Sequence, residues 1–442
     1  MIKGLITPIV KNKLGNLSSS DNYRPIMNSS VFLKLFEYCL LMKMEPYIVL
    51  NDRQHGFRKS YSTATACFVL KETVLNYTKS HSCVYGCFLD ISKAFDTVEH
   101  SILINQLHKL GIPASLVNII EYWYANQFVN VRFKDSFSEE WKIGNGVRQG
   151  GVLSGLLFSI YIDSLLSKVS NTDIGCKLGL INSNIVAYAD DIVLLAPSAN
   201  ALRLLMNIVN VCASELMLSF NYEKTKVMIF RHNSFKNDYN LSNCFNINGV
   251  SLEIVKSIRY LGYVLSDNMD YTEDLNRVKS KFYAEFNVIL RNFNFVDKDV
   301  KVFLFKQYCL QFYGSELWFG PKRPSQELKY FAVGYHKAIK KLISLSTHES
   351  NHFACQETRL LLFCHLLNKL KICAFHRFMI KPCIIVHKAG CFLRVSSVLG
   401  ENVRELLYKE YDVISLFDND IGAICSRILF TQNHETQMRE TW

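Results

Sequence analysis

Three aspartates have the residue type and spacing for metal chemistry. Asp190 and Asp191 are adjacent in the stretch IVAYADDIVLLA, residues 185–196, and Asp90 ends the apolar run VYGCFLD. Neighbouring carboxylates repel each other unless a cation or a proton lies between them, and hard cations such as Mg²⁺ prefer oxygen ligands. An Asp-Asp pair is also typical of a solvated turn, because aspartate favours turns through its own backbone hydrogen bonds. Taken alone, the pair leaves both interpretations open.

The elements around these aspartates predict how they are positioned. Residues 185–196 read as two strands with the Asp pair in the tight turn between them. Residues 84–90 predict a buried strand that carries Asp90 at its end. Strands and helices between 84 and 230 follow an order typical of an α+β fold, an antiparallel sheet backed by helices. Three carboxylates meeting at one cleft would suit two-metal phosphoryl transfer, in which one cation activates a hydroxyl and the other neutralises the leaving phosphate.

Composition sets limits on the whole chain. The 442 residues are 49% hydrophobic with only 8 prolines, which excludes general disorder. The net charge of +11 favours a polyanionic partner, with nucleic acid as the first candidate and a membrane surface as the second. No apolar run approaches the roughly 20 residues that span a bilayer, so we expect no membrane partner.

The N-terminal residues and the cysteines bear on location. MIKGLITPIV lacks the apolar stretch of a secretory signal, so we expect an intracellular protein, with nucleus and cytoplasm both open. The 14 cysteines fit reduced thiols in apolar segments, and we expect no disulfide-linked partner. A zinc site is the alternative for one C-terminal group, which lacks a CxxC pair and has wide intervals: Cys355, Cys364, His365, Cys373, His376 and Cys383.

The N-terminal third predicts strands at 4–14 and 23–26, then helices at 30–44 and 64–77. We expect the first helix to be amphipathic, with its apolar face formed by Val31, Leu33, Leu35, Phe36 and Leu40. Fixed cations suit a triphosphate or a template backbone, and the candidates in this region are Lys11, Arg24 and Arg58. The alternative for each is an ordinary solvated basic residue.

The remaining pattern predicts further elements in order. Helices are expected at 98–110, 116–124, 155–169 and 199–216, and strands at 128–133, 138–143, 227–230 and 257–264, with a hairpin at 245–255 around Asn248-Gly249. The glycine-rich stretch 146–154 enters the helix at 155, where backbone can approach a ligand closely. From residue 272 onward long helical segments are expected at 272–293, 298–313, 326–346 and 353–380.

Several motifs together carry a family resemblance. FLDISKAFD, GVRQGGVLS and YADDIVLL, in that order, resemble the A, B and C motifs of reverse transcriptases. The flanking segments ITPIVK, NYRPI, QHGFRKSYST, LSFNYEKTKVMIF and RYLGYVL resemble the polymerases of non-LTR (LINE-type) retrotransposons. The resemblance runs from about residue 4 to residue 265, and it is the combination of motifs that is specific.

The resemblance implies roles for individual residues. Asp90, Asp190 and Asp191, the last as the less direct ligand, would bind two Mg²⁺ ions, or Mn²⁺, together with the carbonyl of Ile91. Phe95 would pack under the incoming sugar and resist a 2′-hydroxyl, with an ordinary core aromatic as the alternative. The residues implied to contact the nucleotide are Lys11, Arg24, Phe95, Gln149, Gly150 and, as a general acid for pyrophosphate, Lys224. Those assigned to primer or template are Arg58, Tyr260, Leu261 and Gly262.

The resemblance also implies a fold and an activity. We expect a right-hand polymerase with fingers and palm in 1–268, a helical thumb in 269–350 and a helical C-terminal region of undefined role in 351–442. The implied function is an RNA-directed DNA polymerase acting on an RNA template, a DNA primer or target, and dNTPs. The alternative is a truncated or domesticated copy that binds nucleic acid without catalysis. We expect no endonuclease or RNase H segment within these residues.

Two features depart from the family pattern or lie beyond it. Gly155 follows Ser154 where the family usually has proline, which removes a rigid helix start. In the C-terminal part, basic residues among aromatics would either track a duplex backbone or form a solvated helix face: Lys322, Arg323, Lys329, Lys337, Lys340 and Lys341, with Tyr330, Phe331 and Tyr335.

Overall fold

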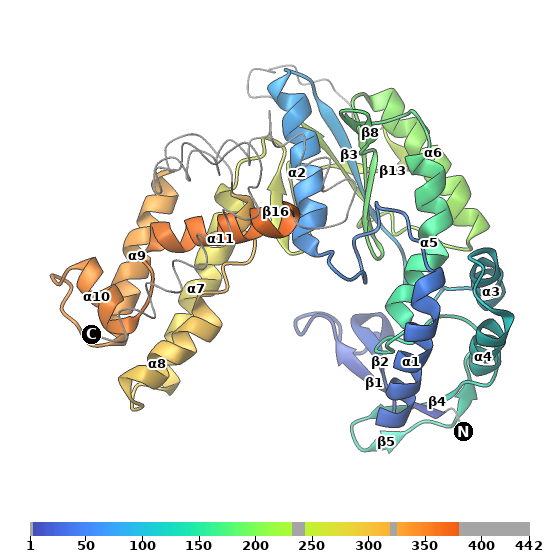
Figure 1. The fold of residues 1–442 in the computed structure, drawn as a ribbon, viewed down its shortest axis with the longest axis horizontal. Coiled ribbons are helices and arrows are strands. Elements are labelled where there is room, and N and C mark those ends of the chain that lie inside the picture. Colours follow the sequence, from blue (N-terminus) through green and yellow to red (C-terminus); the bar gives the residue numbers. More distant parts are fainter. Residues whose placement is uncertain (1–2, 232–243, 319–324, 380–442) are drawn as a thin grey trace. The chain divides into compact units, whose positions relative to one another are not determined.

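The computed structural model describes residues 3–231, 244–318 and 325–379 (Figure 1). The chain divides into two compact units, each described here by itself. The first comprises Met1–Ala66, Val84–Val227 and Asp238–Ile254, and the second comprises Cys67–Cys83, Met228–Asn237 and Val255–Trp442. These units differ from the three predicted regions because the chain crosses between them several times. They do not test the functional division at 268 and 350, which stays a prediction.

The first unit contains a sheet built from the N-terminal strands. Its order is β2-β1-β4-β5, and β6 also pairs with β4. β1 runs antiparallel to β2 and parallel to β4, so residues near 5 and 129 become neighbours. The strands are β1 (Lys3–Val10), β2 (Tyr23–Asn28), β4 (Phe128–Phe133), β5 (Ser136–Phe137) and β6 (Trp141–Lys142). The predicted partner of the 128–133 strand is therefore present as two short strands.

A second sheet positions the aspartates. Its order is β14-β11-β3-β10-β9, with β10 antiparallel to both β3 and β9 and β14 parallel to β11. The strands are β3 (Val84–Asp90), β9 (Ile185–Tyr188), β10 (Asp191–Ala196), β11 (Lys226–Phe230) and β14 (Glu253–Ile254). Asp191 lies opposite Asp90 in the register of β10 with β3 and opposite Tyr188 in the β9–β10 hairpin. Short hairpins add β7 (Lys177–Leu178) with β8 (Ile181–Asn182), and β12 (Asn246–Ile247) with β13 (Val250–Ser251).

Helices form one continuous hydrophobic core with this second sheet. They are α1 (Val31–Met44), α3 (His100–Lys109), α4 (Ala114–Ala125), α5 (Ser154–Ser170) and α6 (Ala199–Glu215). α5 is the most deeply buried: Leu157, Phe158, Tyr161 and Leu165 are fully buried against side chains of β3, β9 and β10. Burial of apolar side chains on this scale is the main force that holds a helix against a sheet. The predicted α+β class, an antiparallel sheet backed by helices, is confirmed.

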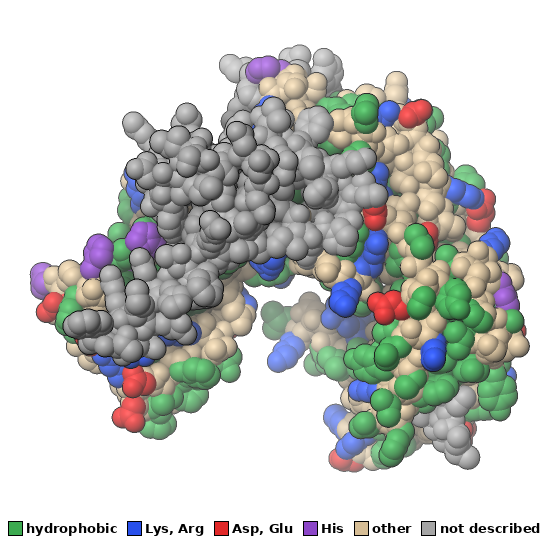
Figure 2. All heavy atoms as spheres, in the orientation of Figure 1, with side chains coloured by type: hydrophobic (Ala, Val, Ile, Leu, Met, Phe, Trp, Pro, Cys, Tyr) green, Lys and Arg blue, Asp and Glu red, His purple; other side chains and the backbone are tan. Residues whose placement is uncertain are grey.

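The apolar face predicted for α1 is partly wrong, since of its five residues Leu40 is buried in the core and Leu33 packs against it. Ser30 caps the helix as expected, accepting a hydrogen bond from the Leu33 amide. The side chains turned to the core, however, are Glu37, Leu40 and Met44, whereas Val31 and Leu35 of the predicted face are 81% and 59% exposed. Hydrophobic side chains accordingly gather on the surface over α1 in Figure 2. The prediction failed because α1 is apolar on nearly every side, so its sequence pattern selects no single face.

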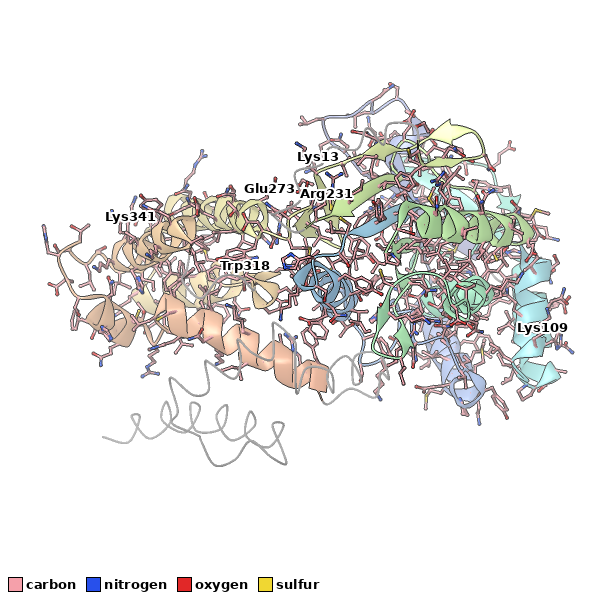
Figure 3. The ribbon with its side chains drawn as sticks, turned by 90° about the horizontal axis from the view of Figure 1, so that it is seen from above. Lys13, Lys109, Arg231, Glu273, Trp318 and Lys341 are labelled. Carbon is pink, nitrogen blue, oxygen red and sulfur yellow. The ribbon has the colours of Figure 1, made fainter. Side chains whose placement is uncertain are left out.

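The second unit is mainly helical. It takes up most of α2 (Thr63–Lys79), with the hairpin β15 (Ser257–Tyr260) and β16 (Tyr263–Ser266), and the helices α7 (Thr272–Asn292), α8 (Lys298–Leu304), α9 (Gln326–Leu342), α10 (Asn351–Thr358) and α11 (Phe363–Met379). Phe282 lies at the centre of its core and contacts the rings of Phe305, Phe312 and Phe331. Trp318, labelled in Figure 3, donates its indole N–H to Asp274 at 2.8 Å. The expected helical C-terminal part is therefore present through residue 379.

Three predicted elements in this unit are divided differently. The strand expected at 257–264 is a hairpin, because Leu261 and Gly262 adopt left-handed φ angles of 47° and 83° and reverse the chain. The helix expected at 353–380 breaks at Arg359, whose φ of 50° ends α10 before α11 begins. The helix expected at 298–313 is α8 followed by a π-helical turn at Phe305–Cys309.

The proposed duplex-tracking group is partly wrong. Lys340 is 7% exposed and donates to the Thr347 carbonyl, and Phe331 and Tyr335 are fully buried in the helical core. Lys329, Lys337 and Lys341 are exposed on α9, as Figure 3 shows for Lys341, and Tyr330 is 60% exposed. Lys322 and Arg323 lie outside the described residues.

Membrane-spanning helices and metal-binding clusters are both absent from the described residues. Within the described ranges no helix has the length and apolarity that crossing a membrane would require. No three His, Cys, Asp or Glu side chains in the described part of the chain are grouped to hold a metal ion, which includes Cys355, Cys364 and Cys373. Cys383 and the side chain of His376, the other members of the predicted zinc group, lie outside the described residues.

Candidate active site

The centre of the site is the turn between β9 and β10. Ala189 adopts a left-handed φ of 56°, Asp190 follows it in the turn, and Asp191 begins β10. Because Asp191 is paired in register with Asp90, the three carboxylates come from one end of one sheet. The sequence predicted this arrangement, and the structure places all three residues together.

The electrostatics of this cluster favour a cation. Burial raises the pKa of Asp90, opposed by Lys224, whose Nζ lies 3.9 Å from the Asp90 carboxylate. Burial also raises the pKa of Asp190; Asp90 raises it further, while a backbone hydrogen bond and Arg24 lower it. Loss of solvation raises the pKa of Asp191 to about 6, with repulsion from Asp190 and Asp90 adding to it. A divalent cation would relieve this repulsion.

The donor set suits a hard metal ion. Besides the carboxylates, the carbonyl of Ile91 is the expected ligand, and the β-bridge between Ile91 and Phe220 does not consume it. The two hydrogen bonds of that bridge use the carbonyls of Asp90 and Ser219 instead. Among the described residues, the three aspartate side chains are not arranged as a complete set of metal ligands. The oxygens fit a divalent ion in type, charge and position along the strands.

Residues 53–58 form a loop that holds the turn between β9 and β10, called the catalytic turn below. The sequence predicted no such role for this loop. The Gln54 side-chain oxygen accepts from the amides of Gly56 and Ala189 at 2.7 and 2.9 Å. His55 and Arg53 exchange backbone hydrogen bonds with Ala187 of β9, so the loop extends the sheet by one bridge. A Cβ at Gly56 would lie 2.4 Å from the Ala189 amide nitrogen, which explains the glycine in QHGF.

Arg58, predicted to contact primer or template, is occupied within its own loop. Its guanidinium donates to the carbonyls of Asn51 and Gln54 at 2.9 and 3.3 Å, and it lies over the Tyr61 ring. Its side chain is 21% exposed. The described contacts therefore give Arg58 a structural role, and the template contact stays a prediction.

The glycine-rich loop is joined to both the N-terminal sheet and the segment that follows the strand of Asp90. The Gln149 carbonyl accepts from the Met27 amide of β2 at 2.7 Å, and its side-chain nitrogen donates to Asp96 at 3.0 Å. Gly150 has a φ of 109°, and a Cβ there would lie 3.0 Å from the Met27 carbonyl. Burial raises the pKa of Asp96, while the Gln149 hydrogen bond lowers it. Gln149 and Gly150 thus lie where the sheet and the loop meet.

A buried ion pair anchors this loop, and sequence reasoning missed it. Arg148 and Glu37 are each 3% exposed at the side chain and lie 3.5 Å apart. The Glu37 carboxylate also accepts from the amides of Val152 and Leu153. Arg148 further donates to Gln127 at 3.0 Å and lies over the ring of Trp123. The only sequence signal was one acidic residue inside an apolar helix.

Of two basic residues predicted for the triphosphate, Arg24 lies on β2 of the N-terminal sheet and Lys11 directly follows β1. Arg24, exposed on β2, acts electrostatically on Asp190, so it faces the carboxylate cluster. Lys11 donates to the Asp21 carbonyl at 2.8 Å and acts on Asp96. Asp21 in turn pairs with Lys93 at 2.8 Å. Both predicted cations are therefore near the site, with Lys11 already bonded to its own loop.

Phe95 is half-buried in a row of aromatic rings. It stacks on Phe158 of α5 with centroids 5.0 Å apart, and Phe57 approaches its edge at 5.9 Å. Its carbonyl accepts from the Val147 amide of the glycine-rich loop. The ring therefore has a packing role, and its role beside the sugar stays a prediction.

The three residues of the expected primer contact belong to the second unit. Leu261 and Gly262 form the turn of the β15–β16 hairpin, and Tyr260 is 4% exposed. Tyr313 fixes this turn, because its hydroxyl donates to the Leu261 carbonyl at 2.7 Å and a Cβ at Gly262 would lie 3.0 Å from its ring. The structure does not place this hairpin relative to the aspartates.

Comparison with known proteins identifies the family. Residues 9–265 match the family model described as reverse transcriptase (RNA-dependent DNA polymerase). The chain belongs to the reverse transcriptase family. The match covers the sheet that carries the aspartates, the glycine-rich loop and the catalytic turn.

Curated relatives of this reverse transcriptase include proteins of transposable elements. It is 31% identical over 189 residues to the Pol polyprotein of the R2DM element of Drosophila melanogaster, covering 42% of this chain and 18% of that protein. It is 26% identical over 275 residues to the probable RNA-directed DNA polymerase from transposon BS of the same fly, covering 60% and 30%. The mobile element jockey of Drosophila funebris gives 26% over 314 residues, covering 66% and 33%. The chain thus spans a third or less of the length of these relatives.

A solved structure is also similar. Apo telomerase from Candida tropicalis has a TM-score of 0.47 and 11% identity, covering 94% of this chain and 68% of that chain. The family assignment rests on the sequence match and on the site geometry described above.

Proposed function

We propose that this reverse transcriptase is an active RNA-directed DNA polymerase that extends a primer on an RNA template. The observation that carries the proposal is the register of β3 and β10, which sets Asp90 opposite Asp191 with Asp190 in the adjoining turn. Burial and mutual repulsion raise the pKa values of Asp190 and Asp191, and a divalent cation between the carboxylates would relieve that repulsion.

Asp90, Asp190 and the Ile91 carbonyl would hold two Mg²⁺ ions, or Mn²⁺, with Asp191 as the less direct ligand. When bound, the ions lower the pKa of the attacking 3′-hydroxyl and neutralise charge on the leaving pyrophosphate. Lys224 lies 3.9 Å from Asp90, from where it would donate a proton to the leaving pyrophosphate. Arg24, with Lys11, would bind the triphosphate oxygens.

The nucleotide would be held from the other side by the glycine-rich loop. Gln149 and Gly150 would line the pocket for the base pair, and Phe95 would exclude the 2′-hydroxyl of a ribonucleotide. The partners of the chain would be an RNA template, a DNA primer or target, and dNTPs. We further propose an intracellular site of action, which fluorescence microscopy of the tagged chain would test.

The test is primer extension by the purified chain with an RNA template, Mg²⁺ and dNTPs. We expect extension by the natural sequence and loss of it in Asp190→Ala. Extension no higher than in Asp190→Ala would refute the activity. A chain that binds RNA–DNA duplex in a salt-dependent way, yet extends nothing, would instead be the nucleic-acid-binding copy.

A further inference from the structure

The Phe57 ring fills the space that a side chain at position 155 would otherwise occupy. A Cβ built on Gly155 at the start of α5 would lie 2.3 Å from the Phe57 ring, far inside van der Waals contact. The family usually has proline at this position, so the glycine is a departure. The structure gives the departure a consequence: the missing side chain is what allows the Phe57 ring to lie against α5.

The backbone conformation of Phe57 is energetically unfavourable unless a contact such as that with α5 stabilises it. Its φ is 54°, a left-handed conformation that a bulky L-residue seldom adopts, and its side chain is 54% exposed. The preceding Gly56 is held against the Ala189 amide of the catalytic turn. The ring is thus presented to solvent from a backbone fixed beside the aspartates. Conformations of this kind are retained where the surroundings over-determine them, as at ligand sites.

The exposed ring lies next to the expected sugar contact. Phe57 and Phe95 meet edge to face, with centroids 5.9 Å apart and planes at 77°, and Phe95 stacks on Phe158. Phe158 is fully buried, so the row of three rings runs from the core of α5 outward to Phe57. The outermost ring is the one that a substrate can touch.

We propose that Phe57 is a specificity-determining residue, a second aromatic wall of the nucleotide pocket that Gly155 makes room for. It fixes the edge of the Phe95 ring and adds its own apolar surface on the sugar side of the incoming nucleotide. This inference rests on the proposed polymerase activity. The substrate class is the deoxynucleoside triphosphate, because an apolar wall gives a 2′-hydroxyl no hydrogen-bond partner.

The test compares incorporation of a dNTP and its rNTP counterpart by primer extension. In Phe57→Ala we expect dNTP extension to persist and the ratio of the kcat/KM values, dNTP over rNTP, to fall roughly 10-fold, the range expected when one pocket contact is lost. Phe57→Leu, which keeps an apolar side chain, should restore part of the ratio. Phe32→Ala is the matched control, since Phe32 is an exposed phenylalanine, 86% accessible, on α1.

A size exchange tests the link to Gly155. Gly155→Ala should raise the KM for dNTP, because its methyl group pushes the Phe57 ring into the pocket. The double variant Phe57→Ala with Gly155→Ala should return the KM to that of Phe57→Ala alone.

Three results would each overturn a different part of the proposal. An unchanged dNTP-to-rNTP ratio in Phe57→Ala, with only a lower melting temperature, would overturn the proposal and leave a packing role. A KM for Gly155→Ala that is not corrected in the double variant would overturn the link between the two residues. Absence of extension by the natural sequence would instead refute the polymerase activity itself.

Discussion

Removal of the Glu37 carboxylate should lower the stability of the protein by an amount that can be worked out from its contacts. In Glu37→Ala, the Arg148 guanidinium loses its carboxylate partner, and the amides of Val152 and Leu153 lose their acceptor. All of these groups lie away from solvent, where water cannot readily replace the lost bonds. Arg148 keeps its bond to Gln127.

The expected loss in the free energy of unfolding follows from the polar groups that lose a partner but stay buried. Breaking a buried ion pair by removing one partner costs about 3–5 kcal/mol, because the remaining charge is uncompensated. Each amide left without an acceptor adds about 1–3 kcal/mol if the loop does not move. Loop movement would relieve part of this, so we expect a net loss of about 3–5 kcal/mol. At about 2–4 °C per kcal/mol, the thermal midpoint should fall by roughly 10 °C.

The functional consequence is confined to the glycine-rich loop. Once Arg148 is released, Gln149 and Gly150 lose their fixed position, and the KM for dNTP should rise more than kcat falls. Glu37→Gln keeps a side-chain oxygen for the two amides, so its losses should be smaller.

Thermal denaturation followed by steady-state primer extension measures both effects. Glu121→Ala is the control, because Glu121 is an exposed glutamate on α4 and its loss should cost less than about 0.5 kcal/mol. If Glu37→Ala were no less stable than Glu121→Ala, the ion pair would have no anchoring role. An unchanged KM in a destabilised Glu37→Ala would refute the positioning argument alone.

Three further predictions follow from the site and the hairpin. The pKa of Asp191 is raised to about 6, so its ionisation opposes folding as pH rises through 6; Asp191→Asn should raise the metal-free melting temperature at pH 7.5 but not near pH 4, and equal midpoints at pH 7.5 would contradict this. Gly56→Ala should lower primer extension about 100-fold by displacing the catalytic turn, whereas Gly144→Ala, in open space, should not; equal activities would exclude the contact. Tyr313→Phe should weaken primer–template binding about fivefold through loss of about 1 kcal/mol at Leu261, and an unchanged Kd would remove the hairpin from the primer contact.

The catalytic strands could be predicted because their sequence pattern has one solution. The runs that precede Asp90 and follow Asp191 are uniformly apolar and short, as expected of strands covered on both faces. The Asp pair itself lies between the apolar run 185–189 and the run that follows Asp191, a pattern that fits a turn between two strands. The pairing of β3 with β10, which brings Asp191 opposite Asp90, is seen only in the structure.

The supporting contacts could not be predicted, because they join segments distant in sequence. Nothing local marks Glu37 as the acceptor for loop amides more than one hundred positions later, and the apolar residues around it suggest a different face of α1. Gln54 likewise bonds to the Ala189 amide across a separation of 135 residues. The turn at Leu261 was missed for a local reason, since leucine seldom adopts a left-handed φ.

These supporting contacts act on main-chain atoms of the candidate active site. The catalytic turn is held through the Ala189 amide, and the glycine-rich loop through the Gln149 carbonyl. Backbone approaches closely at both places: a Cβ at Gly56 would lie 2.4 Å from the Ala189 amide nitrogen, and a Cβ at Gly150 would lie 3.0 Å from the Met27 carbonyl. Gly155 differs from these two glycines, because the group that it admits is the Phe57 ring rather than backbone. A residue at 155 therefore sets the shape of the nucleotide pocket, and its exchange should alter substrate choice before it alters the fold.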